Sequence, residues 1–176
     1  MTADRRTQLA LSDDMTPVAG TTDVAIPIAE LWDFFVESRA WPRWNTCFYW
    51  VRNERLRLGD TLRWAFEPIR PAYLYKLPAS ANIVELEPRR KVTWEVTVLP
   101  GFFARHTYHM EDLGAGRTRF GTWEQAMGAS FRLCRWFWVP HFEFVRDRSL
   151  EGARMLDERY RQHGELASSE YRGAPT

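Results

Sequence analysis

The spacing of apolar residues divides the chain into three parts. Residues 18–27 favour a strand that ends at a proline, and residues 27–38 favour a short helix with apolar side chains three and four positions apart. From residue 48 to residue 127, apolar and polar positions alternate in six segments separated by turns rich in glycine and proline. Residues 141–164 return to helical spacing. The pattern therefore predicts a strand, a short helical pair, a six-stranded antiparallel meander and a long C-terminal helix.

Prolines set two further boundaries. Pro140 suits the start of the terminal helix better than its middle, because proline cannot donate a backbone hydrogen bond within a helix. The aromatic segment 129–139 before it is expected to form a turn or a helical lead-in. Residues 69–78 are rich in proline and are expected to be irregular.

Composition narrows the class of protein. A chain of 176 residues is long enough for one domain with a substantial core. Its net charge is +1 with both signs interspersed, so nucleic acid is not an expected partner, because binding phosphates requires a concentrated basic face. Cys47 and Cys134 lack metal-binding spacing and are expected to be reduced thiols. No apolar run reaches membrane-spanning length and no signal peptide begins the chain, which predicts a cytoplasmic protein.

Three segments carry a family resemblance: "VAIPIAELWDFFVESRAWPRWN", "ANIVELEPRRKVTWEV" and "HTYHMEDLGAGRTRFGTWEQAMG". In this order they resemble START/Bet v 1-like domains, the SRPBCC superfamily of polyketide cyclases/dehydrases and lipid-transport proteins. The resemblance covers residues 18–163, with flexible arms expected at 1–17 and 164–176. It implies an α+β helix-grip fold, in which a curved seven-stranded antiparallel sheet wraps around the C-terminal helix and two short helices follow the first strand. It also implies a cavity between sheet and helix for a hydrophobic ligand.

The turns predict which residues share a face of the sheet. Centring the last three hairpins on Arg89, Gly101 and Ala115 turns the even-numbered residues inward, because side chains alternate between faces. In this register His106 lies opposite Glu124, and Trp94 lies opposite both Val84 and Tyr108. With residues from the strand before and from the terminal helix, the predicted ligand-binding residues are Trp64, Phe66, Asn82, Val84, Trp94, Val96, Phe120, Thr122, Phe142 and Val145.

Polar residues on the inner face are the candidates for chemistry. Glu124 opposite His106 can orient the imidazole and raise its basicity, so that His106, Glu124 and Tyr108 form a candidate catalytic set for proton transfer. The alternative is that these groups satisfy each other's hydrogen bonds in the interior, or anchor a ligand without reacting with it. His141 and His163 lack a partner in the sequence and are expected at the surface. No metal or other cofactor is expected, because the histidines form no ligand cluster.

Three functions remain open at this point. The first is the binding of a lipid, a polyketide or an aromatic metabolite in the cavity. The second is a polyketide aromatase/cyclase that uses the inner His, Tyr and Glu for enolisation and dehydration. The third is an interaction module with a filled core and no ligand. The sequence leaves any protein partner undefined.

Overall fold

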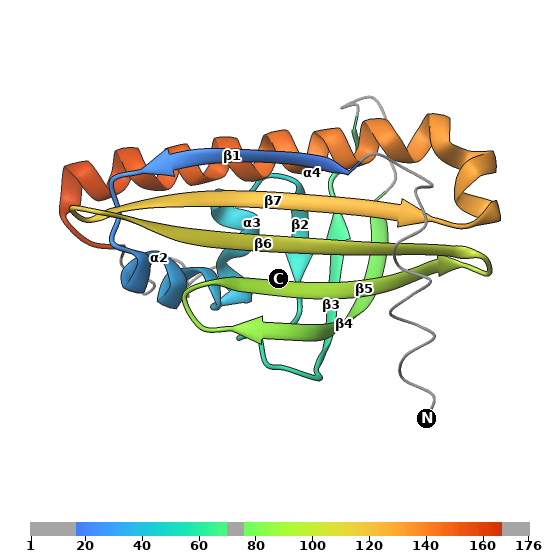
Figure 1. Ribbon diagram of the computed structural model, residues 1–176, viewed down its shortest axis with the longest axis horizontal. Coiled ribbons are helices and arrows are strands. Elements are labelled where there is room, and N and C mark those ends of the chain that lie inside the picture. The colour runs from blue at the N-terminus through green and yellow to red at the C-terminus, as the bar shows by residue number, and fades with distance from the viewer. Residues whose placement is uncertain (1–16, 70–75, 167–176) are drawn as a thin grey trace.

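A computed structural model describes residues 17–69 and 76–166, and it consists of one curved sheet closed by one long helix (Figure 1). Its elements, in chain order, are β1 (Val18–Val24), α2 (Ile28–Phe35), a 3-10 turn (Ser38–Ala40), α3 (Trp41–Trp44), β2 (Phe48–Val51), β3 (Thr61–Phe66), β4 (Leu77–Glu87), β5 (Lys91–Leu99), β6 (Phe102–Gly114), β7 (Arg117–Met127) and α4 (Ala129–His163). The predicted helix-grip fold is confirmed. The predicted flexible arms lie outside the described residues, apart from Pro17 and residues 164–166.

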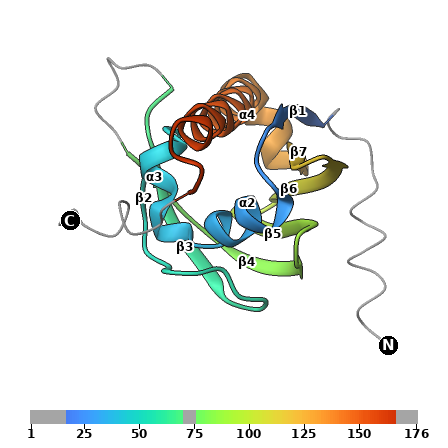
Figure 2. The same cartoon turned by 90° about the vertical axis from the view of Figure 1, so that its left-hand side faces the viewer.

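The sheet is antiparallel, with the strand order β1-β7-β6-β5-β4-β3-β2. Seen end-on, the sheet curls from β1 round to β2, α4 closes the open side of the curl beside β1, and α2 lies within the curl (Figure 2). One apolar face of a sheet needs a cover, and the long helix provides it. The interior therefore lies between the concave face of the sheet and α4.

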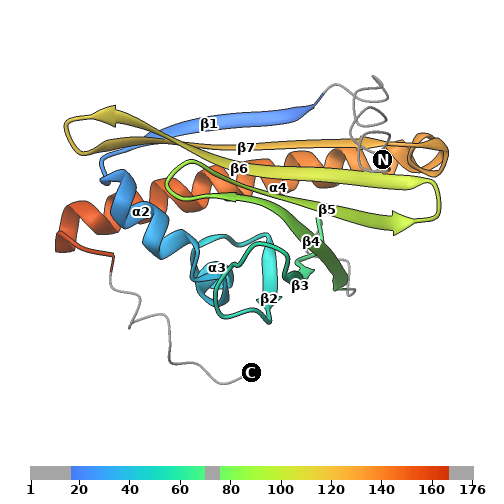
Figure 3. The same ribbon diagram turned by 60° about the horizontal axis from the view of Figure 1, so that its bottom comes forward.

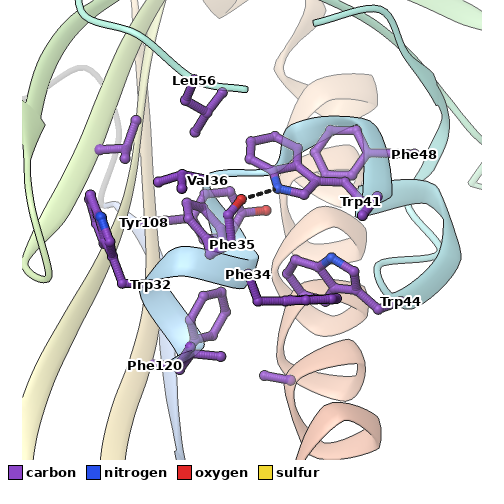
Figure 4. Packing of buried hydrophobic residues seen from close by; sticks show 14 of the residues in the cluster. Trp32, Phe34, Phe35, Val36, Trp41, Trp44, Phe48, Leu56, Tyr108 and Phe120 are labelled. Carbon is purple, nitrogen blue, oxygen red and sulfur yellow. Dashed lines mark hydrogen bonds between the residues drawn. The ribbon is translucent and has the colours of Figure 1, made fainter. Parts of the chain in front are cut away.

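Aromatic side chains fill the end of the interior where α2 and α3 lie. Phe35 is fully buried, and its ring centroid lies 5.2 Å from those of both Trp41 and Tyr108 and 5.9 Å from that of Phe120. Trp41 donates its indole N–H to the Phe35 carbonyl at 2.7 Å, which satisfies a polar group inside this cluster (Figure 4). This end of the interior is a packed core.

Helix α4 begins at Ala129, so the expectation that it starts near Pro140 is wrong. The segment 129–139 is the helical lead-in, and Pro140 lies inside the helix. The first turns of α4 are angled against the rest (Figure 1), which agrees with the kink that an interior proline causes. Ser130 attaches this end to the β5–β6 turn, because its backbone N–H donates to the Gly101 carbonyl at 3.1 Å and its hydroxyl donates to the Pro100 carbonyl at 2.6 Å.

A second attachment holds α4 further along. The hydroxyls of Tyr108 on β6 and Ser149 on α4 lie 2.6 Å apart, and the Asn45 amide donates to Ser149 at 2.9 Å. Close by, α4 approaches α3 without a side chain between them, since a Cβ atom at Gly152 would lie 2.3 Å from the Trp44 carbonyl oxygen. The sheet and both helices are therefore joined at a buried point.

Two hairpin registers differ from prediction. Trp94 lies opposite His106 rather than Tyr108, a shift of two residues that leaves every side chain on its predicted face. In β4 an irregularity between Ile83 and Glu85 exchanges the faces: Ile83 is buried, whereas Asn82 and Val84 are exposed on the outer side. The inward placement of Asn82 and Val84 is therefore wrong. The β6–β7 register, with His106 opposite Glu124, is confirmed.

The sequence also gave expectations for the cysteines, for membrane-spanning segments and for residues 69–78. Both cysteines are free, and Cys47 is buried. None of the helices in the described part of the chain combines the length and the apolar character needed to cross a membrane. Of the stretch 69–78 that was expected to be irregular, residues 70–75 lie outside the described residues, while Leu77 and Pro78 belong to β4.

The substitution Gly152→Ala tests the close approach of α4 to α3. Alanine at an ordinary helix position stabilises by about 1 kcal/mol relative to glycine. At this position we expect a loss of about 1–3 kcal/mol, because the new methyl group would overlap the Trp44 backbone. Urea denaturation measures the difference, and Glu151→Ala on the exposed side should change stability by less than about 0.5 kcal/mol. A more stable Gly152→Ala protein would contradict the packing described here.

Candidate functional site

A cavity of about 680 Å³ lies between the sheet and the first half of α4, beside the aromatic cluster. Its sheet wall includes Trp64 and Trp94, and its helix wall includes Trp138, Phe142 and Val145. The volume lies within the range of about 300–1,000 Å³ that is usual for small-molecule sites. The described residues therefore do not form the filled core that a ligand-free interaction module requires.

Most of the predicted site residues meet at this cavity. Those that line it are Trp64, Phe66, Trp94, Val96, His106, Glu124, Phe142 and Val145. Phe120 and Thr122 are buried on the inner face, but they are not among the described residues that line the cavity. Asn82 and Val84 point to the outer side of β4, as described above.

His106 and Glu124 form a buried pair on the cavity wall. His106 Nδ1 lies 3.1 Å from Glu124 Oε2, and His106 Nε2 lies 3.0 Å from the Thr122 hydroxyl. Because an ionised carboxylate can only accept, the Nδ1 atom carries the hydrogen. The imidazole also stacks on Trp94, with centroids 4.8 Å apart and planes 2° from parallel. Both ring nitrogens therefore have protein partners, and the ring is fixed in place.

Tyr108 lies outside the cavity lining. Its hydroxyl belongs to the buried attachment with Ser149 and Asn45, and burial raises the pKa of Tyr108 well above its ordinary value. A phenol that is enclosed in this way is neutral and joins α4 to the sheet. Its contacts resemble those of a structural group more than those of a group that exchanges protons with a ligand.

His141 was expected at the surface, and that expectation is wrong. It is 3% exposed, lines the cavity and packs edge-on against Phe66 with a centroid distance of 4.7 Å. Its Nε2 atom is buried without a hydrogen-bond partner among the described residues. Burial lowers the pKa of His141 to about 4, although the charge of Glu124 acts in the opposite direction. A neutral imidazole thus faces the space that also contains the Glu124 carboxylate.

Other lining residues were missed because their elements were misplaced. The helical spacing of Trp138, Phe142 and Val145 continues upstream of Pro140, and this signal would have placed Trp138 and His141 on the buried side. Phe48 and residues 77–80 belong to strands whose starts or faces the sequence pattern did not define.

Buried His141 predicts a specific dependence of stability on pH. The unfolded chain protonates this histidine near its ordinary pKa of 6.5, whereas the folded chain does so only near 4. Between these values the unfolded state holds more protons, so the stability that His141 contributes is lost as the pH falls. Between pH 7 and 4.5 the wild type should lose about 2–3 kcal/mol more than His141→Phe, measured by urea denaturation at each pH. Parallel losses in the two proteins would contradict the buried neutral state.

Comparison with known proteins shows which solved structures share this fold. The sequence matches no family model and has no significant match among curated proteins. Among solved structures, the Zhui aromatase/cyclase from a Streptomyces species superposes with a TM-score of 0.64 at 14% identity, over 86% of this chain and 99% of that chain. A START superfamily protein from Mycobacterium smegmatis gives a TM-score of 0.58 at 16% identity, over 83% and 97% of the two chains. The hypothetical protein jhp0584 from Helicobacter pylori gives 0.62 at 14% identity, over 86% and 93%. At these identities the likeness concerns the fold, and it confirms the predicted resemblance: the chain has the helix-grip fold of START-like proteins.

Proposed function

We propose that this protein binds a hydrophobic small molecule, such as a lipid, a polyketide or an aromatic metabolite, in the cavity between the sheet and α4. The observation that carries the proposal is the cavity of about 680 Å³ with tryptophan and phenylalanine side chains on both walls. Burying the apolar surface of a ligand there contributes about 25 cal/mol per Å² before ordering costs. Glu124, His106 and His141 are the polar groups that would orient it.

The fold of the solved neighbours supports the same proposal. A START superfamily protein and aromatase/cyclases share the architecture in which the cavity lies. Fold alone does not fix activity, so the proposal depends on the cavity and its walls.

A second candidate is an aromatase/cyclase, and the observation that favours it is the presence of titratable groups on the cavity wall. Glu124 lines the cavity, and among the described side chains only His106 pairs with it. The carboxylate could take up a proton from an enolisable ligand, with His106 holding it in position. His141 lies on the opposite wall and is neutral at pH 7, so it could accept a proton from the ligand. Tyr108 is not required for this chemistry.

Cavity binding is tested with N-phenyl-1-naphthylamine, a neutral probe that fluoresces in apolar surroundings. The substitution Val96→Trp places an indole in the cavity and should weaken probe binding by about tenfold or more. Val84→Trp is the matched control, because this valine is 44% exposed on the outer side of the sheet. It should leave the affinity within about twofold. Equal affinities for all three proteins would show that the probe binds elsewhere and would remove the support for the proposal.

The substitution His106→Gln separates the carrier from the cyclase. A carrier should retain ligand binding with a modest loss of affinity, because glutamine can still bond to Glu124. In a cyclase the glutamine amide would still hold Glu124, but it cannot take on positive charge beside the carboxylate as the imidazole can. Affinity for a poly-β-ketone substrate should therefore be kept, while turnover falls by about tenfold or more. His109→Gln on the outer side of the same strand controls for effects of substitution in β6. Unchanged turnover in His106→Gln would exclude a catalytic part for this residue.

A further inference from the structure

The hydrogen-bonded ladder between β4 and β5 extends over only part of the two strands. β4 pairs with β5 from Asn82 to Glu87, whereas its earlier residues pair only with β3. β5 pairs with β4 from Lys91 to Glu95, whereas its residues from Val96 onward pair only with β6. Beyond the last pair the two strands diverge, as Figures 1 and 3 show. Pro78, which has no N–H to donate, lies on the diverging part of β4.

The cavity passes through the sheet at this divergence. All of residues 77–80 on β4 and all of residues 96–99 on β5 line it. Side chains alternate between the faces of a strand, so a cavity confined to one face would meet every second residue. Here it meets the inward-facing Ala79 and Val96 together with the exposed Ser80 and Thr97. The interior therefore opens to the outer face between β4 and β5.

Two arginines lie at the outer end of this opening. Arg63 is exposed between the buried Leu62 and Trp64, and it pairs with Ser80 at the edge of the gap. The backbone N–H of Arg52 donates to the Arg63 carbonyl at 3.0 Å, and both arginines line the cavity. Because Arg52 and Arg63 lie on adjacent strand segments, their guanidinium groups can act on one bound anion.

The two ends of the cavity carry charged residues of opposite sign. No carboxylate in the described part of the chain forms an ion pair with Arg52 or Arg63, although many other surface arginines have such a partner. The Arg52 guanidinium instead lies over the Trp50 ring at 5.2 Å from its centroid. Glu124 is the acidic residue among the described lining residues, and it lies on the inner wall. The outer end is thus positive, and the space between the two ends is aromatic.

We propose that the gap between β4 and β5 is the entrance to the cavity and that Arg52 and Arg63 bind the anionic end of the ligand. The inference rests on the proposed binding of a hydrophobic small molecule and narrows its class. The ligand has a flat apolar body, which enters between the strands, and a carboxylate, sulfonate or phosphate group, which remains outside on the two guanidinium groups. Arginine binds such groups through paired N–H donors, and partial exposure limits each contact to a modest gain.

Two probes with the same apolar body test this assignment. 1-Anilinonaphthalene-8-sulfonate carries an anionic group, and N-phenyl-1-naphthylamine lacks it. The double variant Arg52→Gln/Arg63→Gln should bind the anionic probe about fivefold more weakly than the wild type does. Its affinity for the neutral probe should stay within about twofold of the wild-type value. The control Arg57→Gln/Arg117→Gln removes the same charge from exposed arginines that do not line the cavity, and it should leave both probes within about twofold.

The outcomes separate this inference from the proposed function. Unchanged binding of the anionic probe to Arg52→Gln/Arg63→Gln, or equal losses for both probes, would overturn the assignment of the arginines while leaving cavity binding intact. Failure of the neutral probe to bind the wild type would contradict cavity binding, and this inference with it. Vesicles of phosphatidylglycerol provide a third arm: binding of the wild type to vesicles that is lost in the double variant, without any effect on the soluble anionic probe, would assign the arginines to a membrane and overturn the proposal.

The entrance itself has a kinetic signature. Thr97→Trp places a bulky side chain at the outer rim of the gap, so it should slow association and dissociation of the anionic probe by a similar factor, about fivefold, with little change in affinity. Val84→Trp, on the outer side of β4 but outside the cavity lining, should leave both rates unchanged. A Thr97→Trp protein with wild-type rates would show that ligands enter elsewhere.

Discussion

Two attachments of α4 determine where the protein is solid and where it is hollow. Ser130 fixes the first turn of the helix to the β5–β6 turn, and Ser149 fixes its middle to Tyr108 and Asn45. Between these points Phe131 of the helix packs against Phe102 of the sheet, and the cavity of about 680 Å³ lies beside this contact. Close packing of a core normally removes such space, so a hollow of this size needs rigid supports on both sides.

The same division gives the inner polar groups different environments. Tyr108, on the packed side, is enclosed by hydrogen-bond partners and contributes to the attachment of the helix. His106 and Glu124 belong to the cavity wall, where stacking on Trp94 and the contact with Thr122 hold the imidazole in one orientation. A fixed pair of this kind can orient a ligand without spending binding energy on ordering its own side chains. His141 adds a neutral imidazole from the helix side, so the sheet wall and the helix wall each carry polar side chains.

Local turn chemistry explains which parts of this arrangement the sequence predicts. Gly114 and Gly116 flank Ala115 in a turn where all three have positive φ, and this fixes the β6–β7 register that brings His106 to Glu124. In β4 the adjacent apolar residues Ile83 and Val84 fit either face, so alternation alone cannot locate the irregularity that turns Val84 outward. Pro140 is a sound marker of a helix boundary in isolation, but packing of the aromatic lead-in overrides it. Where β4 diverges from β5 depends on how residues far apart in the sequence pair with each other. The local pattern of apolar and polar residues does not predict this pairing.

The central claim is that the interior of this helix-grip fold contains a cavity that is open to an apolar ligand. A crystal structure of the protein with bound N-phenyl-1-naphthylamine tests it most directly. The account predicts density for the aromatic probe between Trp64 and Trp94 of the sheet and Phe142 of α4. Density only on the outer surface, or an interior in which Trp138 and Phe142 close the space against the sheet, would contradict it.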